Sequence, residues 1–459
     1  MLVDALIFAT EAIKVEAGAV RQLQDAAALP TVAHALGMPD IHQGYGVPIG
    51  SVVATREVIV PAAVGYDINC GMRLILTALT AGEVDVRALA DSIARDIPLG
   101  EGRSNVRLSA SEFETVAEGG LSGLTMLTPK GGHRVWDFFD RSAERNNLER
   151  VEDRGSMEGD LAAVPPRAIE RGLDQLATLG GGNHFIELQR VDRIFDEAKA
   201  LRLGLFKGQL AIMVHSGSRG FGHEIGGHFM RLAKQFDHDH GGAPSPSLHF
   251  LPADGKEGRD YFAAMNAAAN FAFANRALMA ALVIGNLLHY YPEARPRLLY
   301  DVPHNIAKLE RHPGGTFWVH RKGSTRAWDR ERMRGTAFSD LGQPVLIPGS
   351  MGTASYVLAG LESGEVSLFS VNHGAGRVMS RTAAAGGRKG RKRKQESAIS
   401  DDDFKQSMKG IYLIAADRRA VKEEAPAAYK DIDAVIETVT AAGLAAAVAR
   451  LVPQAVLKG

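Results

Sequence analysis

The sequence predicts a protein of the α/β or α+β class that folds as one large body. Short β-branched stretches typical of strands recur along the chain, and segments with apolar residues at helical spacing separate them. The chain of 459 residues could hold about three average domains. We find no internal repeat and no clear domain linker, however. We therefore expect a single body over residues 1–459.

The positions of the predicted elements follow from the spacing of apolar residues. We expect strands at 50–55 and 58–60, followed by Pro61, and apolar runs predict two further strands at 185–188 and 210–214. Helical periodicity predicts helices at 84–97, 166–179, 224–238, 260–291 and 431–451.

The most apolar stretch, residues 263–288, predicts a long buried helix and not a membrane span. Polar side chains interrupt it before it reaches the uninterrupted length that a span requires. These are Asn266, Asn270, Asn275, Arg276 and Asn286.

Two stretches are expected at the surface. Residues 238–252 are rich in Gly, Pro, His and Asp and predict a loop. The run 388–394 carries six basic residues in seven and precedes three aspartates at 401–403, so we predict that 386–403 is a mobile, solvated loop. Because this run follows a glycine-rich histidine motif, attraction to nucleic-acid phosphates is a second interpretation.

The overall composition is that of an ordinary soluble globular protein, with 45% hydrophobic and 23% charged residues. The 53 basic and 53 acidic residues balance, so any contact with nucleic acid must come from a local basic patch. A single cysteine excludes an internal disulfide, and the N-terminal residues do not resemble a secretory signal. We therefore expect a cytoplasmic protein without a membrane partner.

The only cysteine, Cys70, follows Asp67 by three residues in a segment flanked by glycines. A thiolate combined with a carboxylate favours a transition metal such as Mn, Fe, Co or Zn. Taken alone, a single cysteine is more often a small buried hydrophobe. The metal interpretation gains weight from histidines in glycine-rich segments with polar neighbours, at Asn183-His184, His215 to Arg219, His304-Asn305 and His373 to Arg377.

These candidate ligands are expected where strands begin or end, which is where rigid scaffolds present chemistry. His184 lies where the strand after Gly180 to Gly182 begins, and His215 follows the apolar run 210–214. The full candidate set is Asp67, Cys70, His184, His215 and His304. If these residues converge, they offer more donors than one tetrahedral ion needs, and a bridging thiolate or carboxylate would hold two ions. Such a site suits phosphoryl or nucleotidyl transfer.

Two further segments carry groups suited to phosphate. Residues 348–355 combine glycines with hydroxyl side chains but lack the ending of a P-loop, and a tight turn between strands is the alternative interpretation. In the second segment, His373 lies among glycines and near the arginines Arg377 and Arg381. That imidazole could serve as a further metal ligand or as a covalent nucleophile.

Together these motifs resemble those of the RtcB family of GTP-dependent RNA-splicing ligases. The resemblance runs from Met38 to Gly459 and includes 64–70, 180–187, 214–220, 304–305, 319–323, 348–355 and 373–381. It implies an α+β fold of mixed sheets and surrounding helices, two Mn²⁺ ions and GTP. It also implies an RNA substrate, with a 3′-phosphate or 2′,3′-cyclic phosphate end joined to a 5′-hydroxyl end in tRNA splicing or RNA repair.

The resemblance also implies a role for individual residues. One Mn²⁺ would be held by Asp67, Cys70 and His184, and the other by Cys70, His215 and His304. His373 would be the nucleophile that becomes guanylylated. The residues implied to bind the nucleotide are Asp40 and Asn183 near the metals, Ser350 at phosphate, Gly374, Ala375, Gly376 and Arg377 beside the nucleophile, and Glu187, Ser355, Tyr429 and Lys458 at guanine.

Two other functions remain open from the sequence. A dinuclear phosphodiesterase or phosphatase that acts on RNA ends would use the same ligands without GTP. A non-catalytic RNA-binding relative would keep only the fold, and degenerate ligands would be its signature.

Overall fold

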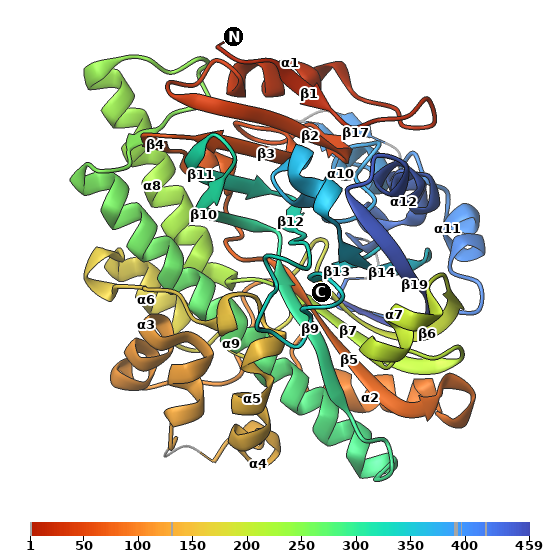
Figure 1. The fold of residues 1–459 in the computed structure, drawn as a ribbon. Helices are drawn as coiled ribbons and strands as arrows, with labels where there is room; N and C mark the ends of the chain where they lie inside the picture. Colours follow the sequence, from red (N-terminus) through yellow and green to blue (C-terminus); the bar gives the residue numbers. More distant parts are fainter. Residues whose placement is uncertain (1, 130–131, 390–392, 396, 418–419) are drawn as a thin grey trace.

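In the computed structural model, which describes residues 2–129, 132–389, 393–395, 397–417 and 420–459, two mixed sheets form the centre of the protein (Figure 1). The larger sheet has the order β13-β14-β19-β6-β7-β5-β9, and β18 pairs with β19. Its strands are β5 (Gly71–Thr80), β6 (Phe185–Ile194), β7 (Gln209–Ser216), β9 (Arg297–Pro303), β13 (Pro344–Ile347), β14 (Ser355–Gly360), β18 (Tyr412–Ala415) and β19 (Ala445–Lys458).

The second sheet has the order β1-β2-β3-β11-β10. Its strands are β1 (Ala5–Ile7), β2 (Val32–His42), β3 (Ile49–Thr55), β10 (Asn305–His312) and β11 (Gly315–Lys322). Three short pairs complete the described strands, namely β4 (Val58–Ile59) with β8 (Leu251–Pro252), β12 (Ser324–Arg326) with β15 (Ser370–Asn372), and β16 (Gly387–Lys389) with β17 (Arg393–Gln395).

The helices surround these sheets (Figure 1). The α-helices are α1 (Ala17–Ala26), α2 (Val86–Asp96), α3 (Ala110–Met126), α4 (Val135–Phe138), α5 (Arg141–Asn147), α6 (Pro166–Gly172), α7 (Glu197–Leu203), α8 (Arg219–His240), α9 (Lys256–Tyr290), α10 (Arg381–Ala385), α11 (Asp401–Ser407) and α12 (Ile432–Ala441). The mixture of helices and sheets in one body confirms the predicted α+β class.

The centre of the larger sheet is buried on both faces. Along β7, Ile212 and Val214 join the apolar cluster that contains α9, whereas Ala211 and Met213 join a second cluster on the opposite face. Successive side chains of a strand point to opposite faces, so a continuous apolar run is what a strand covered on both sides requires. The central strands of this sheet are therefore packed between two hydrophobic cores, one on each face.

The long helix α9 has the length and composition of a membrane span, but 83% of its most apolar window is buried inside the protein. Its polar side chains bond to neighbouring segments. Asn270 donates to the carbonyls of Ala117 and Met157, and Asn275 donates to the carbonyl of Gly217. The predicted buried helix at 260–291 is confirmed.

Most predicted elements are present, with shifted ends. The expected strands at 50–55, 58–60, 185–188 and 210–214 correspond to β3, β4, β6 and β7, and the expected helices at 84–97 and 224–238 to α2 and α8. The loop predicted at 238–252 begins after α8 ends at His240. The segment 348–355 connects β13 to β14, two antiparallel neighbours, and is therefore a turn between strands.

Two predicted helices were wrong in part. The helix expected at 166–179 ends at Gly172, because the segment beyond it bonds to 98–106, where Val106 donates to the carbonyl of Leu176. The helix expected at 431–451 ends at Ala441, and Gly443, with φ of +66°, turns the chain into β19. The alanines of β19 favour a helix by intrinsic propensity. Pairing with β14 and β6 overrides that preference and makes the segment a strand.

The basic segment contains a short described hairpin. Strand β16 pairs antiparallel with β17, and α11 begins at Asp401. Residues 390–392 and 396 lie outside the described residues. The predicted mobility of 386–403 stays a prediction.

Candidate functional site

The predicted metal ligands meet at one edge of the larger sheet. Because β5, β7, β6 and β9 are joined by antiparallel pairing, the start of β5 and the start of β6 lie beside the end of β7 and the end of β9. The register pairs Met72 with His215, Phe185 with His215, and Gly71 with Pro303. Cys70, His184 and His304 each adjoin one of these paired residues in the sequence, so residues far apart along the chain become neighbours.

The donor atoms form two groups that share the cysteine. Sγ of Cys70 lies 3.2 Å from Nε2 of His184 and 3.1 Å from Nε2 of His215. Nε2 of His184 lies 2.7 Å from Oδ2 of Asp67, and Nε2 of His215 lies 3.4 Å from Nε2 of His304. Within the described residues, the groups that could hold a metal ion are Asp67, Cys70, His184 and Cys70, His215, His304.

The spacing and chemistry of these donors fit metal ions. Two ligand atoms placed about 2.1 Å from a tetrahedral ion lie ~3.4 Å from each other. The sulfur of Cys70 and the Nε2 atoms of the three histidines have similar separations, from 3.1 to 3.4 Å. Cys70, His215 and His304 are buried, so water competes poorly for them. A thiolate with imidazoles and a carboxylate suits Mn, Fe, Co or Zn better than Mg or Ca.

Buried polar contacts fix the segments that carry the ligands. Arg276, with no exposed surface, donates to the carbonyls of Asn69 and Ser216, each next to a ligand, and pairs with Asp301. The Asn305 side chain donates to the carbonyl of Asp67. The ligand positions are therefore set by the folded protein itself.

The electrostatics of the cluster favour binding of a cation. Burial, followed by the Asp67 carboxylate, raises the pKa of the Cys70 thiol well above its usual value. Burial, followed by the neighbouring imidazoles, lowers the pKa of both His215 and His304, so both rings are neutral and can donate lone pairs. Burial alone would raise the pKa of Asp67, but the adjacent His184 lowers it overall, so this group is a carboxylate.

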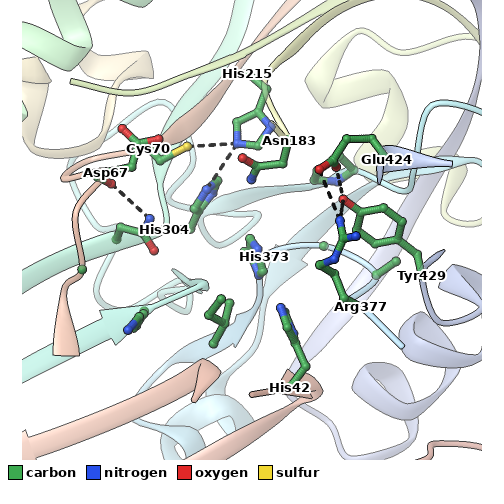
Figure 2. Close-up of a pocket in the computed structure, with 18 of the residues that line it drawn as sticks. His42, Asp67, Cys70, Asn183, His215, His304, His373, Arg377, Glu424 and Tyr429 are labelled. Atoms are coloured by element: carbon green, nitrogen blue, oxygen red, sulfur yellow. Dashed lines mark hydrogen bonds and ion pairs between the residues drawn. The ribbon is translucent and has the colours of Figure 1, made fainter. Parts of the chain in front are cut away.

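His373 lies next to this cluster. It follows β15, and its ring centroid is 4.9 Å from that of His304. Its Nδ1 lies 2.7 Å from Oδ2 of Asp40, on β2. Figure 2 shows His373 between the cysteine and histidine cluster on one side and Arg377, Glu424 and Tyr429 on the other.

A cavity of about 380 Å³ joins these groups. It reaches four of the five candidate metal ligands, among them Cys70 and His215, and also His373. The other predicted residues that line it are Asp67, Asn183, His304, Ser350, Gly374, Ala375, Gly376, Arg377, Tyr429 and Lys458. Gly376 has φ of +77°, and a Cβ there would lie 2.1 Å from the Asp40 carbonyl oxygen, so only glycine fits at this position near His373.

The predicted guanine-binding residues are divided between the cavity and the protein interior. Tyr429 and Lys458 line the cavity, whereas Glu187 and Ser355 are not among its lining residues. Both of these bond to the Gln189 amide, at 2.6 Å and 2.9 Å. Burial raises the pKa of Glu187 to about 8 and lowers that of Lys458.

Sequence reasoning missed Glu424. This buried carboxylate accepts hydrogen bonds from Arg377 and Tyr429 and lies 4.0 Å from Nζ of Lys458 (Figure 2). Burial would raise the pKa of Glu424, but Lys458 and then Arg377 lower it overall, so it is an anion. No signal in the run Lys422 to Pro426 distinguishes this glutamate from its neighbour Glu423.

His42 was also missed as a site residue. It lines the cavity two positions after Asp40, at the end of β2. Its Nδ1 lies 2.9 Å from the Asp40 carbonyl oxygen, and burial lowers its pKa to about 4. A pair of polar residues two positions apart in a mostly apolar strand was the signal that could have identified it.

Comparison with known proteins identifies the family. The family model described as tRNA-splicing ligase RtcB matches residues 22–459. The tRNA-splicing ligase RtcB of Thermococcus kodakarensis is 41% identical over 96% of this chain and 91% of its own length, and that of Archaeoglobus fulgidus is 39% identical over 97% and 92%. The RNA-splicing ligase RtcB of Mycobacterium bovis is 41% identical over 95% of this chain and all of its own. The chain therefore belongs to the RtcB family.

Proposed function

We propose that this protein is an RNA ligase that joins an RNA 3′-phosphate or 2′,3′-cyclic phosphate end to a 5′-hydroxyl end, with GMP carried on His373. Membership of a family whose curated members are named RNA- or tRNA-splicing ligases supports the ligase activity. The observation that carries the finer proposal is the position of the His373 imidazole, beside two donor groups that share the sulfur of Cys70.

Two Mn²⁺ ions are the proposed cofactors, held by Asp67, Cys70 and His184 and by Cys70, His215 and His304. When bound, they would neutralise charge on phosphate oxygens and orient the attacking and leaving groups. The donor spacing and the soft sulfur ligand support this assignment over Mg²⁺ or Ca²⁺.

In the first proposed step, Nε2 of His373 attacks the α-phosphorus of GTP, a nitrogen–phosphorus bond forms and pyrophosphate leaves. The Asp40 carboxylate accepts a hydrogen bond from Nδ1–H of His373, which keeps the proton on Nδ1 and leaves the Nε2 lone pair available for attack. The glycines beside His373 leave room for the triphosphate, and Arg377 and Ser350 supply donors for its oxygens.

In the second and third steps, the GMP group moves to the RNA. A 3′-phosphate has no good leaving group, so a 5′-hydroxyl cannot displace anything from it. A 2′,3′-cyclic end first takes up water, which breaks its bond to the 2′-oxygen and gives a 3′-phosphate. An oxygen of the 3′-phosphate then attacks the guanylyl phosphorus, His373 leaves, and the RNA end becomes an anhydride. The 5′-hydroxyl oxygen then attacks the RNA phosphorus, a phosphodiester forms and GMP leaves.

Guanine selectivity is proposed to come from the Lys458 side of the cavity. An ionised Glu187 would accept from the N1 and N2 donors of guanine, and Lys458 would donate to O6 or N7. Adenine presents the opposite pattern at these positions, and leaves buried groups unpaired. Tyr429 and Ser355 are the remaining residues proposed to contact guanine.

Incubation of the purified protein with Mn²⁺ and GTP labelled at the α-phosphate tests the proposal. We expect a covalent label on the protein that His373→Ala abolishes and that His289→Ala, a change to an exposed histidine outside the cavity, leaves intact. A wild-type protein that takes up no label, or that trims RNA ends equally well without GTP, would support a phosphodiesterase instead.

A further inference from the structure

Two exposed tyrosines lie at the active-site cavity. Tyr45 is 48% exposed and Tyr66 is 40% exposed, and both line the same cavity as His373. Tyr66 directly precedes the candidate metal ligand Asp67, so its backbone is only about 3.8 Å from that ligand. Large aromatic rings exposed to solvent beside a candidate active site indicate a surface that a ligand covers.

The Tyr66 ring is stacked on a histidine ring, and the Tyr45 ring is tilted against it at 43°. The rings of Tyr66 and His223, on α8, have centroids 4.9 Å apart and planes at 21°. The ring of Tyr45 lies 6.2 Å from that of Tyr66. We call Tyr45, Tyr66 and His223 the aromatic platform.

The segments beneath the aromatic platform are tightly held. A Cβ at Gly226 would lie 2.8 Å from the Gly65 carbonyl oxygen and 3.2 Å from Cα of Tyr66, so α8 approaches this backbone as closely as only glycine permits. The buried Lys322 amine donates to the carbonyls of Tyr45, Val47 and Ala62. The rings are therefore presented from a fixed backbone, which reduces the entropy lost when a ligand stacks on them.

Positive charge lies beside the platform. A Cβ at Gly227 would lie 3.3 Å from Nη1 of Arg231 and 3.7 Å from Cε1 of Tyr66, so both side chains cover the same turn of α8. Two acidic residues adjoin the platform in sequence, and both have partners: Glu224 lies 2.7 Å from Arg171, and Asp67 lies 2.7 Å from His184. A planar ring beside a guanidinium is the combination that single-stranded nucleic acid prefers.

We infer that the aromatic platform stacks an unpaired nucleobase of the RNA, next to the end that reacts. The inference rests on the proposed function, because it takes an RNA end as the ligand. Tyr429 lies across His373 from the metal ligands, so guanine and the RNA base would occupy opposite sides of the nucleophile (Figure 2). Stacking accepts every base, because each base has a π-face, and so holds the end without selecting its sequence.

Fluorescence of a base analogue tests this inference on the unmodified protein. Single-stranded RNA with 2-aminopurine at the nucleotide beside the 3′-phosphate, or beside the 5′-hydroxyl, is titrated with the full chain and Mn²⁺ in the absence of GTP. We expect quenching for one of the two placements, which identifies the strand that stacks. RNA that binds without quenching at either placement would overturn the platform and leave the ligase proposal standing, whereas RNA that does not bind at all would overturn both.

Variants give the second measurement. Tyr66→Ala should weaken binding of the quenched RNA about tenfold, and Tyr66→Phe, which keeps the ring, should restore it. Tyr290→Ala is the matched control, because Tyr290 is 42% exposed and is not among the residues that line the cavity. Removing the stacked base from the RNA should weaken binding to the wild type but not to Tyr66→Ala. An equal loss for both proteins would count against the platform.

Discussion

Nδ1 of His373 lies 2.7 Å from Oδ2 of Asp40, although 333 residues separate them in the sequence. The Asp40 side chain has no exposed surface, and the backbone N–H of His373 donates to the same oxygen at 3.3 Å. A buried carboxylate that accepts a hydrogen bond from one ring nitrogen fixes the tautomer and the orientation of the imidazole, and so directs the lone pair of the other nitrogen.

From this pair we predict that Asp40→Ala slows transfer of GMP to His373 about 100-fold, because the ring loses both its orientation and its tautomer. Asp40→Asn should fall between Asp40→Ala and the wild type, since the amide oxygen can still accept a hydrogen bond from Nδ1–H. The measurement is the single-turnover rate of protein labelling by α-labelled GTP. Asp192→Asn, in an ion pair with Arg450, serves as the control. A wild-type rate for Asp40→Ala would show that His373 needs no partner.

The shared sulfur leads to a prediction about metal content. Cys70→Ala should remove a ligand from both ions, whereas His184→Ala should remove a ligand from only one. After equilibrium dialysis against Mn²⁺, we expect two ions per chain for the wild type, about one for His184→Ala and almost none for Cys70→Ala. Elemental analysis by mass spectrometry gives the counts. Equal losses in the two variants would contradict a bridging sulfur.

Arg276 should contribute to stability far more than a surface ion pair does. It is fully buried with Asp301 and holds two backbone carbonyls, so Arg276→Gln leaves these groups without their cation and should lower the free energy of unfolding by about 3 kcal/mol. Arg334 pairs with Glu331 where both side chains are mostly exposed, and Arg334→Ala should change it by less than about 1 kcal/mol. Urea unfolding of the metal-free protein compares the two. Similar shifts would mean that the Arg276 contacts are not what stabilises this edge.

The sequence predicted the chemistry of the site better than its long-range pairing. Cysteine, histidine and aspartate near strand ends are visible as local motifs, so the candidate ligands could be named, and the antiparallel register explains why they meet. The partner of His373 could not be derived from spacing, because the bond to Asp40 joins β2 of the second sheet to the segment after the short strand β15. Glu424 carries no local signal, because only the folded chain brings Arg377, Tyr429 and Lys458 around it.

The errors in secondary structure have the same origin. Half of residues 442–451 are alanine, the residue with the highest intrinsic preference for a helix. The pairing of β19 with β14 and β6 then decides the outcome. The long helix α9 could be predicted because its apolar, alanine-rich run of 35 residues is far longer than a strand and contains no proline.

The raised pKa of Glu187 leads to a pH dependence of GTP binding. With a pKa of about 8, this carboxyl is mostly neutral at pH 7, and only its anion accepts both the N1 and N2 protons of guanine. Raising the pH from 7 to 8.5 should therefore tighten GTP binding several-fold, toward a limit of about tenfold. Burial also lowers the pKa of Lys458, and loss of its charge should weaken GTP binding. Isothermal titration calorimetry from pH 6.5 to 9 measures the affinity for GTP. Glu187→Gln should bind GTP weakly and lose the rise below pH 8.5, and a rise that persists in this variant would assign the titration to another group.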